Sequence, residues 1–353
     1  MLQGNSIKNA LSKLDFDFRT LLADTNLVRL AFIMTASFVL MAALNPGVYL
    51  TVRNFQSMAF QFPEIGLMAI AVMIAMLMGG INLSVLGIAN LSSIVAAFVM
   101  IAAEPQIGGW GATFLGIATA LVVGLVCGAL NGALIAFVGI PAILATLGTM
   151  EIFTGIAVYI TGGPAVFGLP SEFALIGSAT VLGVIPMPLI IFVIIVAVYI
   201  VVLQYKKFGL EVYLMGTNRK AAQFTGILTE FTIVKAHMLS GLLAAFGGII
   251  MSSRFVSAKS DYGSSYTILA ILVAVLGGVN PFGGFGKVMG VVMAILTIQF
   301  LSSGFNMLRA DAYLRTGAWG ALLVAMLLIN YFGNKRAEKK QIEAMNNTKI
   351  TEA

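Results

Sequence analysis

Long uncharged apolar runs recur along almost the whole chain, and they decide what it can fold into. A helix that crosses a membrane needs about 20 mostly apolar residues. Runs of about this length predict helices near 28–45, 57–78, 85–103, 113–137, 141–161, 186–205, 232–252, 267–279, 286–306 and 315–333. The sequence therefore predicts an all-α polytopic membrane protein with about ten transmembrane helices.

Composition supports a membrane protein and excludes a cytosolic enzyme. Of the 353 residues, 59% are apolar and only 10% are charged, whereas a soluble domain is nearer one quarter charged. The single cysteine, Cys127, lies inside an apolar run, so we expect neither a disulfide framework nor a thiolate metal site. The net charge of +6 is explained by the position of the basic residues relative to a membrane, and no nucleic-acid partner is expected.

The distribution of lysine and arginine predicts the orientation. With the N-terminus inside, 15 of the 20 basic residues fall in cytoplasmic segments and 5 in outer loops. This excess follows the positive-inside rule, so both termini are expected to be cytoplasmic. The chain then divides into a cytoplasmic N-terminal segment at 1–27, a transmembrane domain at 28–333 with a large cytoplasmic loop at 206–231, and a cytoplasmic tail at 334–353.

A short motif occurs twice, as GGIN at 79–82 and as GGVN at 277–280. Each copy closes an apolar run, as expected for a broken helix that faces protein or a water-filled path. Two related halves of a transporter would explain the repetition. Chance recurrence of four residues is the alternative.

The loop at 206–231 is long compared with the other connections, and it contains a predicted short helix. Thr217 or Asn218 can cap the start, the stretch 219–224 is helix-compatible, and Gly226 can end it. The alternative is an ordinary helix at the membrane surface whose cations reach into water.

Two carboxylates lie well inside predicted spans, and both are expected to face the interior of the bundle. On the fifth helix, Glu151 shares an arc of roughly 140° with Thr146, Thr154 and Thr161, which suits a hydrophilic solute path. The alternative is that the threonines bond their own backbone and that Glu151 caps a neighbouring helix.

The other carboxylate, Glu64, follows Pro63, which removes an amide donor and kinks the helix. Phe60 and Phe62 flank it and could stack against a sugar ring. A packed kink without a ligand is the alternative. Asn82 and Asn90 could contact solute hydroxyls, although each could equally make an interhelical hydrogen bond.

The chain contains no match to the phosphate-binding pattern G-x-x-x-x-G-K-(S/T), since the glycines and lysine of GGVNPFGGFGK (277–287) have other spacing. It therefore cannot hydrolyse ATP alone. The single histidine, His237, has no second ligand at metal-binding spacing.

Several segments together resemble one family. GTNRKAAQFTGI (216–227) is similar to the cytoplasmic loop of ribose-type permeases, the membrane subunits of ATP-binding-cassette importers for simple sugars. Further similar segments are MGGINLSV (78–85), IPAILATLGTMEIFTGIA (140–157), TGGPAVFGLP (161–170), HMLSGLLAAFGGIIMSSR (237–254) and LGGVNPFGGFGKVMG (276–290).

The resemblance implies a BtuC-like (type II-like) permease bundle in the bacterial inner membrane. It implies partners: two ATPase subunits, which carry ATP and Mg, a second permease copy or homologue, and an extracytoplasmic solute-binding protein. This chain itself holds no cofactor. The loop helix would dock in a groove of the ATPase, with the coupling surface formed by Gly216, Asn218, Arg219, Ala221, Ala222 and Gly226.

The chain departs from the family pattern near the presumed path. Asn82 replaces the usual Asp, Leu86 displaces a glycine, Thr154 replaces a frequent Arg, and Thr267 begins a segment of different sequence. The solute is therefore expected to be a monosaccharide or similar small polyhydroxy compound, not ribose by default. Alternatives are import of a nucleoside or furanosyl signal molecule, and a proton-coupled secondary transporter that uses Glu64 or Glu151. The candidate path residues are Phe60, Phe62, Glu64, Asn82, Asn90, Thr146, Thr149, Glu151, Thr154 and Thr267.

Overall fold

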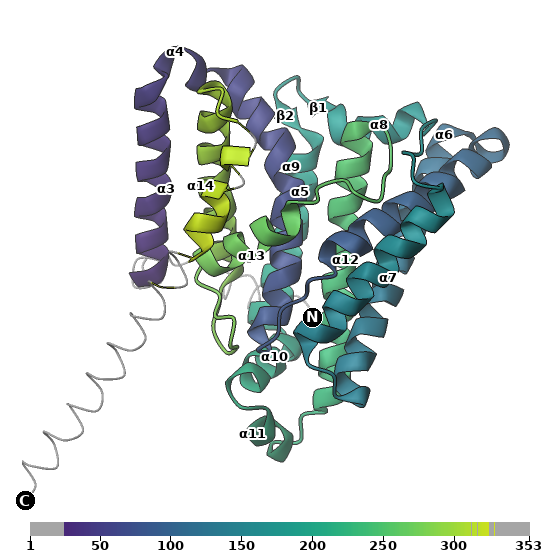
Figure 1. The fold of residues 1–353 in the computed structure, drawn as a ribbon, viewed down its shortest axis with the longest axis vertical. Helices are drawn as coiled ribbons and strands as arrows, with labels where there is room; N and C mark the ends of the chain where they lie inside the picture. The colour runs from purple at the N-terminus through teal and green to yellow at the C-terminus, as the bar shows by residue number, and fades with distance from the viewer. Residues whose placement is uncertain (1–24, 312, 316, 325–327, 329–353) are drawn as a thin grey trace, which may run out of the picture.

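A computed structural model describes residues 25–311, 313–315, 317–324 and 328 (Figure 1). Residues 1–24 of the predicted N-terminal segment (1–27), the predicted tail at 334–353, and nine of the 19 residues of the predicted helix at 315–333 lie outside these residues. The helices are α3 (Thr25–Leu44), α4 (Pro46–Tyr49), α5 (Val52–Leu77), α6 (Val85–Ala133) with π-helical η1 (Leu134–Val138), α7 (Ala142–Thr161), α8 (Ser171–Ser178), α9 (Met187–Ile200) with π-helical η2 (Val201–Tyr205), α10 (Lys207–Thr217), α11 (Arg219–Phe224), α12 (Thr229–Phe255), α13 (Tyr266–Leu276) and α14 (Val288–Met307). Two short strands, β1 (Thr180–Val181) and β2 (Ile185–Pro186), pair antiparallel.

Seven helical segments of the described chain are long and apolar enough to cross a membrane. The longest, 85–138, changes direction at Gly108, whose φ of 74° and ψ of 168° are not helical. Beyond this glycine the chain folds back on itself. Gly116 then lies so close to Met100 that an added Cβ would overlap the Met100 side chain. The separate helices predicted at 85–103 and 113–137 are therefore the two arms of one hairpin.

The predicted count of ten spans is not confirmed by these residues. α13 has 11 residues and, at 1.5 Å per residue, reaches only part of the way across an apolar layer of about 30 Å. A polytopic all-α bundle is what the described residues show.

α5 and α12 form the centre of the bundle. Every residue of α5 from Phe62 to Leu77 is buried, as expected for a helix that other helices surround. α12 packs against α6 through small residues, and a Cβ on Gly241 would overlap the carbonyl oxygen of Gly124. Such small-residue contacts allow close backbone approach in membrane helices.

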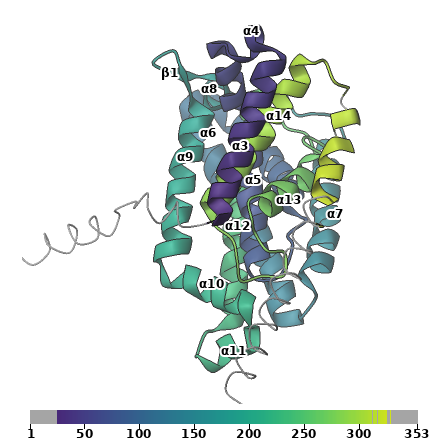
Figure 2. The same cartoon turned by 90° about the vertical axis from the view of Figure 1, so that its left-hand side faces the viewer.

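The short helices mark the two ends of the bundle. α10 and α11 project at one end, here called the α11 end, and α4 and α8 lie at the other, here called the α8 end (Figures 1 and 2). α3 and α14 stand together on one side, while α7 runs along the opposite side. The broken segments after α5 and α13 both lie towards the α11 end.

α5 and α13 end in the same way. Gly79 and Gly278 both adopt a left-handed conformation, with φ of 83° and 81°. The next amide donates back five residues in each case, from Gly80 to Ala75 at 3.2 Å and from Val279 to Ala274 at 3.1 Å. This is the Schellman pattern of helix termination. The left-handed glycine is the first of GGIN but the second of GGVN, and the relation of the two halves stays a prediction.

Candidate solute path and coupling loop

The loop at 206–231 contains two helices instead of the single predicted one. The predicted helix is α11, and its cap is confirmed: Asn218 Oδ1 accepts a hydrogen bond from the amide of Ala221 at 3.0 Å. Gly226 follows with a φ of 81°. α10 was missed, although Phe208, Val212 and Met215 have the spacing of one helical face.

The exposed surface of α11 differs from the predicted coupling surface. Ala222 is buried against Met215 and Ile233, so it supports the helix from inside. Ala221 is exposed, and Phe224, which the sequence analysis did not select, is 91% exposed. Arg219 is half exposed and pairs with Glu230 at 3.6 Å.

The end of α10 is joined to both broken segments, and we call this contact the glycine junction (Gly79, Gly216, Gly283 and Gly284). A Cβ on Gly216 would overlap Leu77 O and the amide of Gly284. A Cβ on Gly283 would come within 2.9 Å of the Gly79 nitrogen. The Gly284 amide donates to Leu77 O at 3.0 Å. Backbone therefore lies directly on backbone where the loop, α5 and the segment before α14 meet.

Tyr213 adds a side-chain bond to the glycine junction. Its hydroxyl donates to Gly286 O at 2.6 Å. Burial raises the pKa of Tyr213 to about 12, so the hydroxyl remains a donor near neutral pH. α10 is thus bound to the segment before α14 at two successive places.

The first broken segment, 78–84, is held by polar side chains from three other helices. Thr146 Oγ1 donates to Ile81 O at 3.0 Å and accepts from the amide of Leu83 at 3.1 Å. Asn82 donates to Ser240 Oγ at 2.9 Å, and Asn131 donates to Ser84 Oγ at 2.6 Å. Irregular backbone at membrane depth needs such partners. Asn82 and Thr146, both predicted path residues, therefore have a structural role here.

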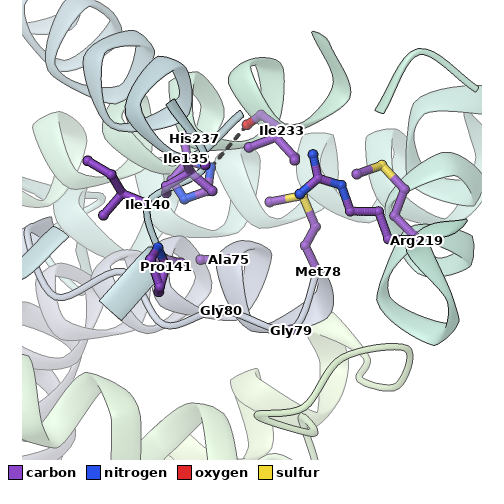
Figure 3. Close-up of a pocket in the computed structure, with 13 residues that line it drawn as sticks. Ala75, Met78, Gly79, Gly80, Ile135, Ile140, Pro141, Arg219, Ile233 and His237 are labelled. Atoms are coloured by element: carbon purple, nitrogen blue, oxygen red, sulfur yellow. Dashed lines mark hydrogen bonds between the residues drawn. The ribbon is translucent and has the colours of Figure 1, made fainter. Parts of the chain in front are cut away.

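A cavity of about 220 Å³ adjoins this segment at the α11 end (Figure 3). Arg219 enters it from one side and His237 from the other. His237 is buried, with Nδ1 3.0 Å from Ile233 O and Nε2 without a partner among the described residues. The cavity thus connects the first broken segment with the loop that carries α11. Its lining residues are Ala75, Met78, Gly79, Gly80, Ile135, Gly139, Ile140, Pro141, Ala142, Met215, Arg219, Ile233 and His237.

Glu64 faces the interior of the bundle, as predicted, but it is not free. Its Oε1 lies 3.1 Å from Arg254 Nη1 and accepts from the Tyr266 hydroxyl at 2.8 Å. Arg254 also donates to Phe60 O at 3.2 Å, in the turn that Pro63 interrupts. Of the two predicted interpretations, the packed kink fits this arrangement.

The predicted aromatic sugar contact beside Glu64 stays a prediction, and the ring of Phe62 faces protein in this structure. Its ring is buried and packs edge-on against Phe192, with centroids 5.3 Å apart. Phe60 is half buried and lines an open pocket of about 450 Å³ at the α8 end. Most residues that line that pocket have polar side chains: Arg53, Gln56, Ser57, Phe60, Gln61, Gly177, Ser178 and Arg254.

Three further predicted path residues lie in different parts of the bundle. Asn90 donates to Ser260 O at 2.8 Å and to Tyr262 O at 3.0 Å, so it holds the segment before α13. Thr149 donates to Thr146 O in its own helix at 3.3 Å, which was the alternative proposed for these threonines. Thr267 is half buried in the first turn of α13.

The predicted interior position of Glu151 is wrong for a single chain. α7 packs through Ala145, Thr149, Phe153 and Ala157, which recur every four residues. Glu151 lies on the other face and is exposed. The predicted polar arc is therefore divided, because Thr146 is buried and Thr154 and Thr161 are half buried, while the carboxylate faces out.

Gly148 and Gly155 flank Glu151 on that exposed face, and each has open space where a Cβ would stand. Thr154 is half buried at its edge. This face of α7 is the one place among the described spans where a carboxylate and two uncovered glycines are presented outward.

The described residues thus form a bundle of apolar helices, two of which end at left-handed glycines, with a helical loop packed against the segments that follow. The chain belongs to the family described as branched-chain amino acid transport system / permease component, whose family model matches residues 54–330. It is thus a multi-pass membrane protein.

Relatives of known name cover most of the chain. The ribose import permease protein RbsC of Haemophilus influenzae is 34% identical over 84% of this chain and 91% of its own length. The autoinducer 2 import system permease protein LsrD of Photorhabdus temperata is 32% identical over 84% of this chain and 88% of its own. The D-allose transport system permease protein AlsC of Escherichia coli is 30% identical over 85% and 90%. No solved structure matches the chain. The predicted resemblance to ribose-type permeases is confirmed.

Proposed function

We propose that this chain is the membrane-spanning subunit of an ATP-binding-cassette importer that moves a monosaccharide or similar small polyhydroxy solute into the cytoplasm. The names of the three relatives support this solute class, since each covers more than four fifths of the chain. The family description names branched-chain amino acids, so a sugar-like solute has to be tested against them.

The observation that carries the mechanism is the glycine junction. A separate ATPase pair would hold α11 through its exposed residues, Arg219, Ala221 and Phe224. Because Gly216 lies on Leu77 and Gly284 without intervening side chains, movement of α10 would shift the end of α5 and the segment before α14 together. ATP and Mg belong to the partner subunits in this scheme.

The α11 end is then the cytoplasmic end, in agreement with the excess of basic residues in the predicted inner segments. Both termini would be cytoplasmic and the membrane would be the bacterial inner membrane. The solute-binding protein would deliver its cargo at the α8 end, beside the pocket that Arg53 and Arg254 line.

The solute path is proposed to run between two permease copies along the exposed face of α7. An ionised carboxylate in contact with lipid is unfavourable by about 2.5–3.5 kcal/mol, so Glu151 needs a protein or water environment that one copy does not give it. Gly148 and Gly155 would admit close helix approach. Glu151 and Thr154 remain the path candidates, because Phe62, Glu64, Asn82, Asn90 and Thr146 have their contacts inside one chain.

Uptake into liposomes tests the function. The complete complex should accumulate solute only with the binding protein and ATP present. A thermal-shift screen of that binding protein, with pentoses, hexoses, nucleosides, autoinducer 2 and branched-chain amino acids, would identify the solute class. Preference for leucine or valine would contradict a sugar-like solute. Uptake by the permease alone under a pH gradient would contradict the ATP-driven mechanism.

A further inference from the structure

A groove of about 550 Å³ lies on the outside of the bundle, where η2, α10 and the first turns of α12 meet. Three of its residues are exposed lysines: Lys206, Lys207 and Lys235. The walls below them are apolar and half buried, formed by Leu125, Val202, Phe208, Met238 and Leu239. We call it the lysine groove. Glu211 completes its lining.

The rim of the lysine groove carries excess positive charge. Glu211 pairs with Lys207 at 3.5 Å and accepts a hydrogen bond from Thr232 at 3.2 Å. Lys206 and Lys235 have no carboxylate partner in the part of the chain that the structure describes. Two ammonium groups are therefore left uncompensated at the rim of one apolar recess.

The groove lies at the level where a membrane-spanning helix ends. Lys206 is the first residue after η2, and Tyr205 beside it is 54% exposed, as is typical of aromatic residues at a membrane surface. The walls continue onto exposed apolar side chains of α6 and α9, Val122, Val126 and Val198. The apolar walls thus face acyl chains while the lysines stand among headgroups.

We propose that the lysine groove binds an anionic phospholipid. Its phosphate would lie between Lys206 and Lys235, and one acyl chain would lie along Leu125, Val202 and Leu239. Basic pockets between membrane helices bind such headgroups. A zwitterionic lipid brings no net charge, and free phosphate has no chain for the apolar walls. Because α10 lines the groove and leads to Gly216, the bound lipid also fixes the loop. This inference depends on the membrane position and not on the identity of the solute.

Native mass spectrometry of the complete complex tests the lipid. Delipidated complex is titrated with phosphatidylglycerol or with phosphatidylcholine of the same acyl chains. The wild type is expected to retain phosphatidylglycerol, and Lys206→Gln/Lys235→Gln is expected to weaken its retention roughly 30-fold, the effect of two charges near a membrane surface. Arg29→Gln/Lys287→Gln removes two charges at the same end and is expected to change nothing.

A second variant keeps the charges and fills the recess. Leu125→Trp is expected to lower retention of phosphatidylglycerol as well, which separates loss of the groove from general misfolding of a lysine variant. Equal retention of the two lipids by the wild type, or undiminished retention by the lysine variant, would overturn the proposal. Displacement of phosphatidylglycerol by millimolar inorganic phosphate would assign the lysines to a free anion and overturn it too.

Discussion

The amide of Gly284 donates a hydrogen bond to the carbonyl oxygen of Leu77 at 3.0 Å. Leu77 is the last residue of α5, and Gly284 belongs to the segment before α14. Gly216, at the end of α10, is packed on both. A loop that lies outside the bundle therefore has a direct backbone contact with the end of α5 and with the segment before α14.

Substitution of Gly216 by alanine should push α10 away from Leu77 and Gly284. The added methyl group overlaps Leu77 O and the Gly284 amide, and overpacking of this kind costs about 1–3 kcal/mol. We expect a lower unfolding temperature and an ATPase rate that no longer responds to the loaded binding protein. Gly47→Ala places the same group in α4, where nothing lies within 4 Å, and should leave both readouts unchanged. Normal solute-stimulated ATPase activity in Gly216→Ala would exclude the glycine junction from coupling.

Reversal of the charge of Arg219 should weaken binding of the ATPase subunits. The side chain is half exposed and pairs with Glu230 at 3.6 Å, an interaction of at most about 1 kcal/mol at the surface. The double variant Arg219→Glu/Glu230→Arg restores an ion pair between positions 219 and 230. Position 219 remains negative, however, so the positive charge that would contact the ATPase is still absent. We expect co-purification of the ATPase to fall in the single and in the double variant. Its recovery in the double variant would show that Arg219 only stabilises the loop.

Loss of one partner of the Glu64–Arg254 pair should destabilise the bundle strongly. Glu64 is fully buried, and removal of one member of a buried ion pair costs about 3–5 kcal/mol. Arg254→Met should therefore lower the unfolding temperature more than Glu64→Met/Arg254→Met does. Lys259→Met removes one member of the exposed pair with Asp261 and serves as the control, with little expected change, because water screens an exposed pair. Equal effects of Arg254→Met and Lys259→Met would contradict the paired-kink interpretation.

Glu151 should lie close to its equivalent, or to solute, in the assembled dimer. In a Cys127→Ala background, Glu151→Cys is expected to form a cross-linked dimer in membranes, whereas Phe32→Cys on the exposed side of α3 should not. Glu151→Gln should reduce uptake with little change in stability, because the side chain is exposed within one chain. If Glu151→Cys stays monomeric under cross-linking conditions and Glu151→Gln takes up solute normally, the exposed face of α7 contacts lipid and the proposal is contradicted.

Hydropathy alone located most of the long helices, and the reason is physical: an apolar layer of fixed thickness requires runs of fixed length. The cap at Asn218 and the breaks at Gly79 and Gly278 were also predictable, because capping and left-handed turns depend on neighbouring residues. The position of the turn was not predicted: two consecutive spans imply a reversal between 103 and 113, but nothing in the hydropathy assigns it to Gly108.

The direction of Glu151 could not be predicted from the spacing of polar residues. Helical periodicity shows which side chains share a face, but the packed face of α7 is decided by Phe153 and Ala157 meeting other helices. The same holds for Gly216 and Gly284, whose contact joins distant parts of the chain. Pairing of Glu64 with Arg254 likewise required knowledge of where α12 ends.

The enclosure of α5 from Phe62 to Leu77 has a consequence for the order of assembly. Glu64 is synthesised 190 residues before Arg254, so the nascent helix enters the lipid with an uncompensated carboxyl group. Retention of that helix in the bilayer during translation depends on its apolar neighbours, and its last turn has no contact with Gly284 until the ribosome has made nearly the whole protein. A chain truncated before Arg254 should therefore be a substrate for membrane proteases.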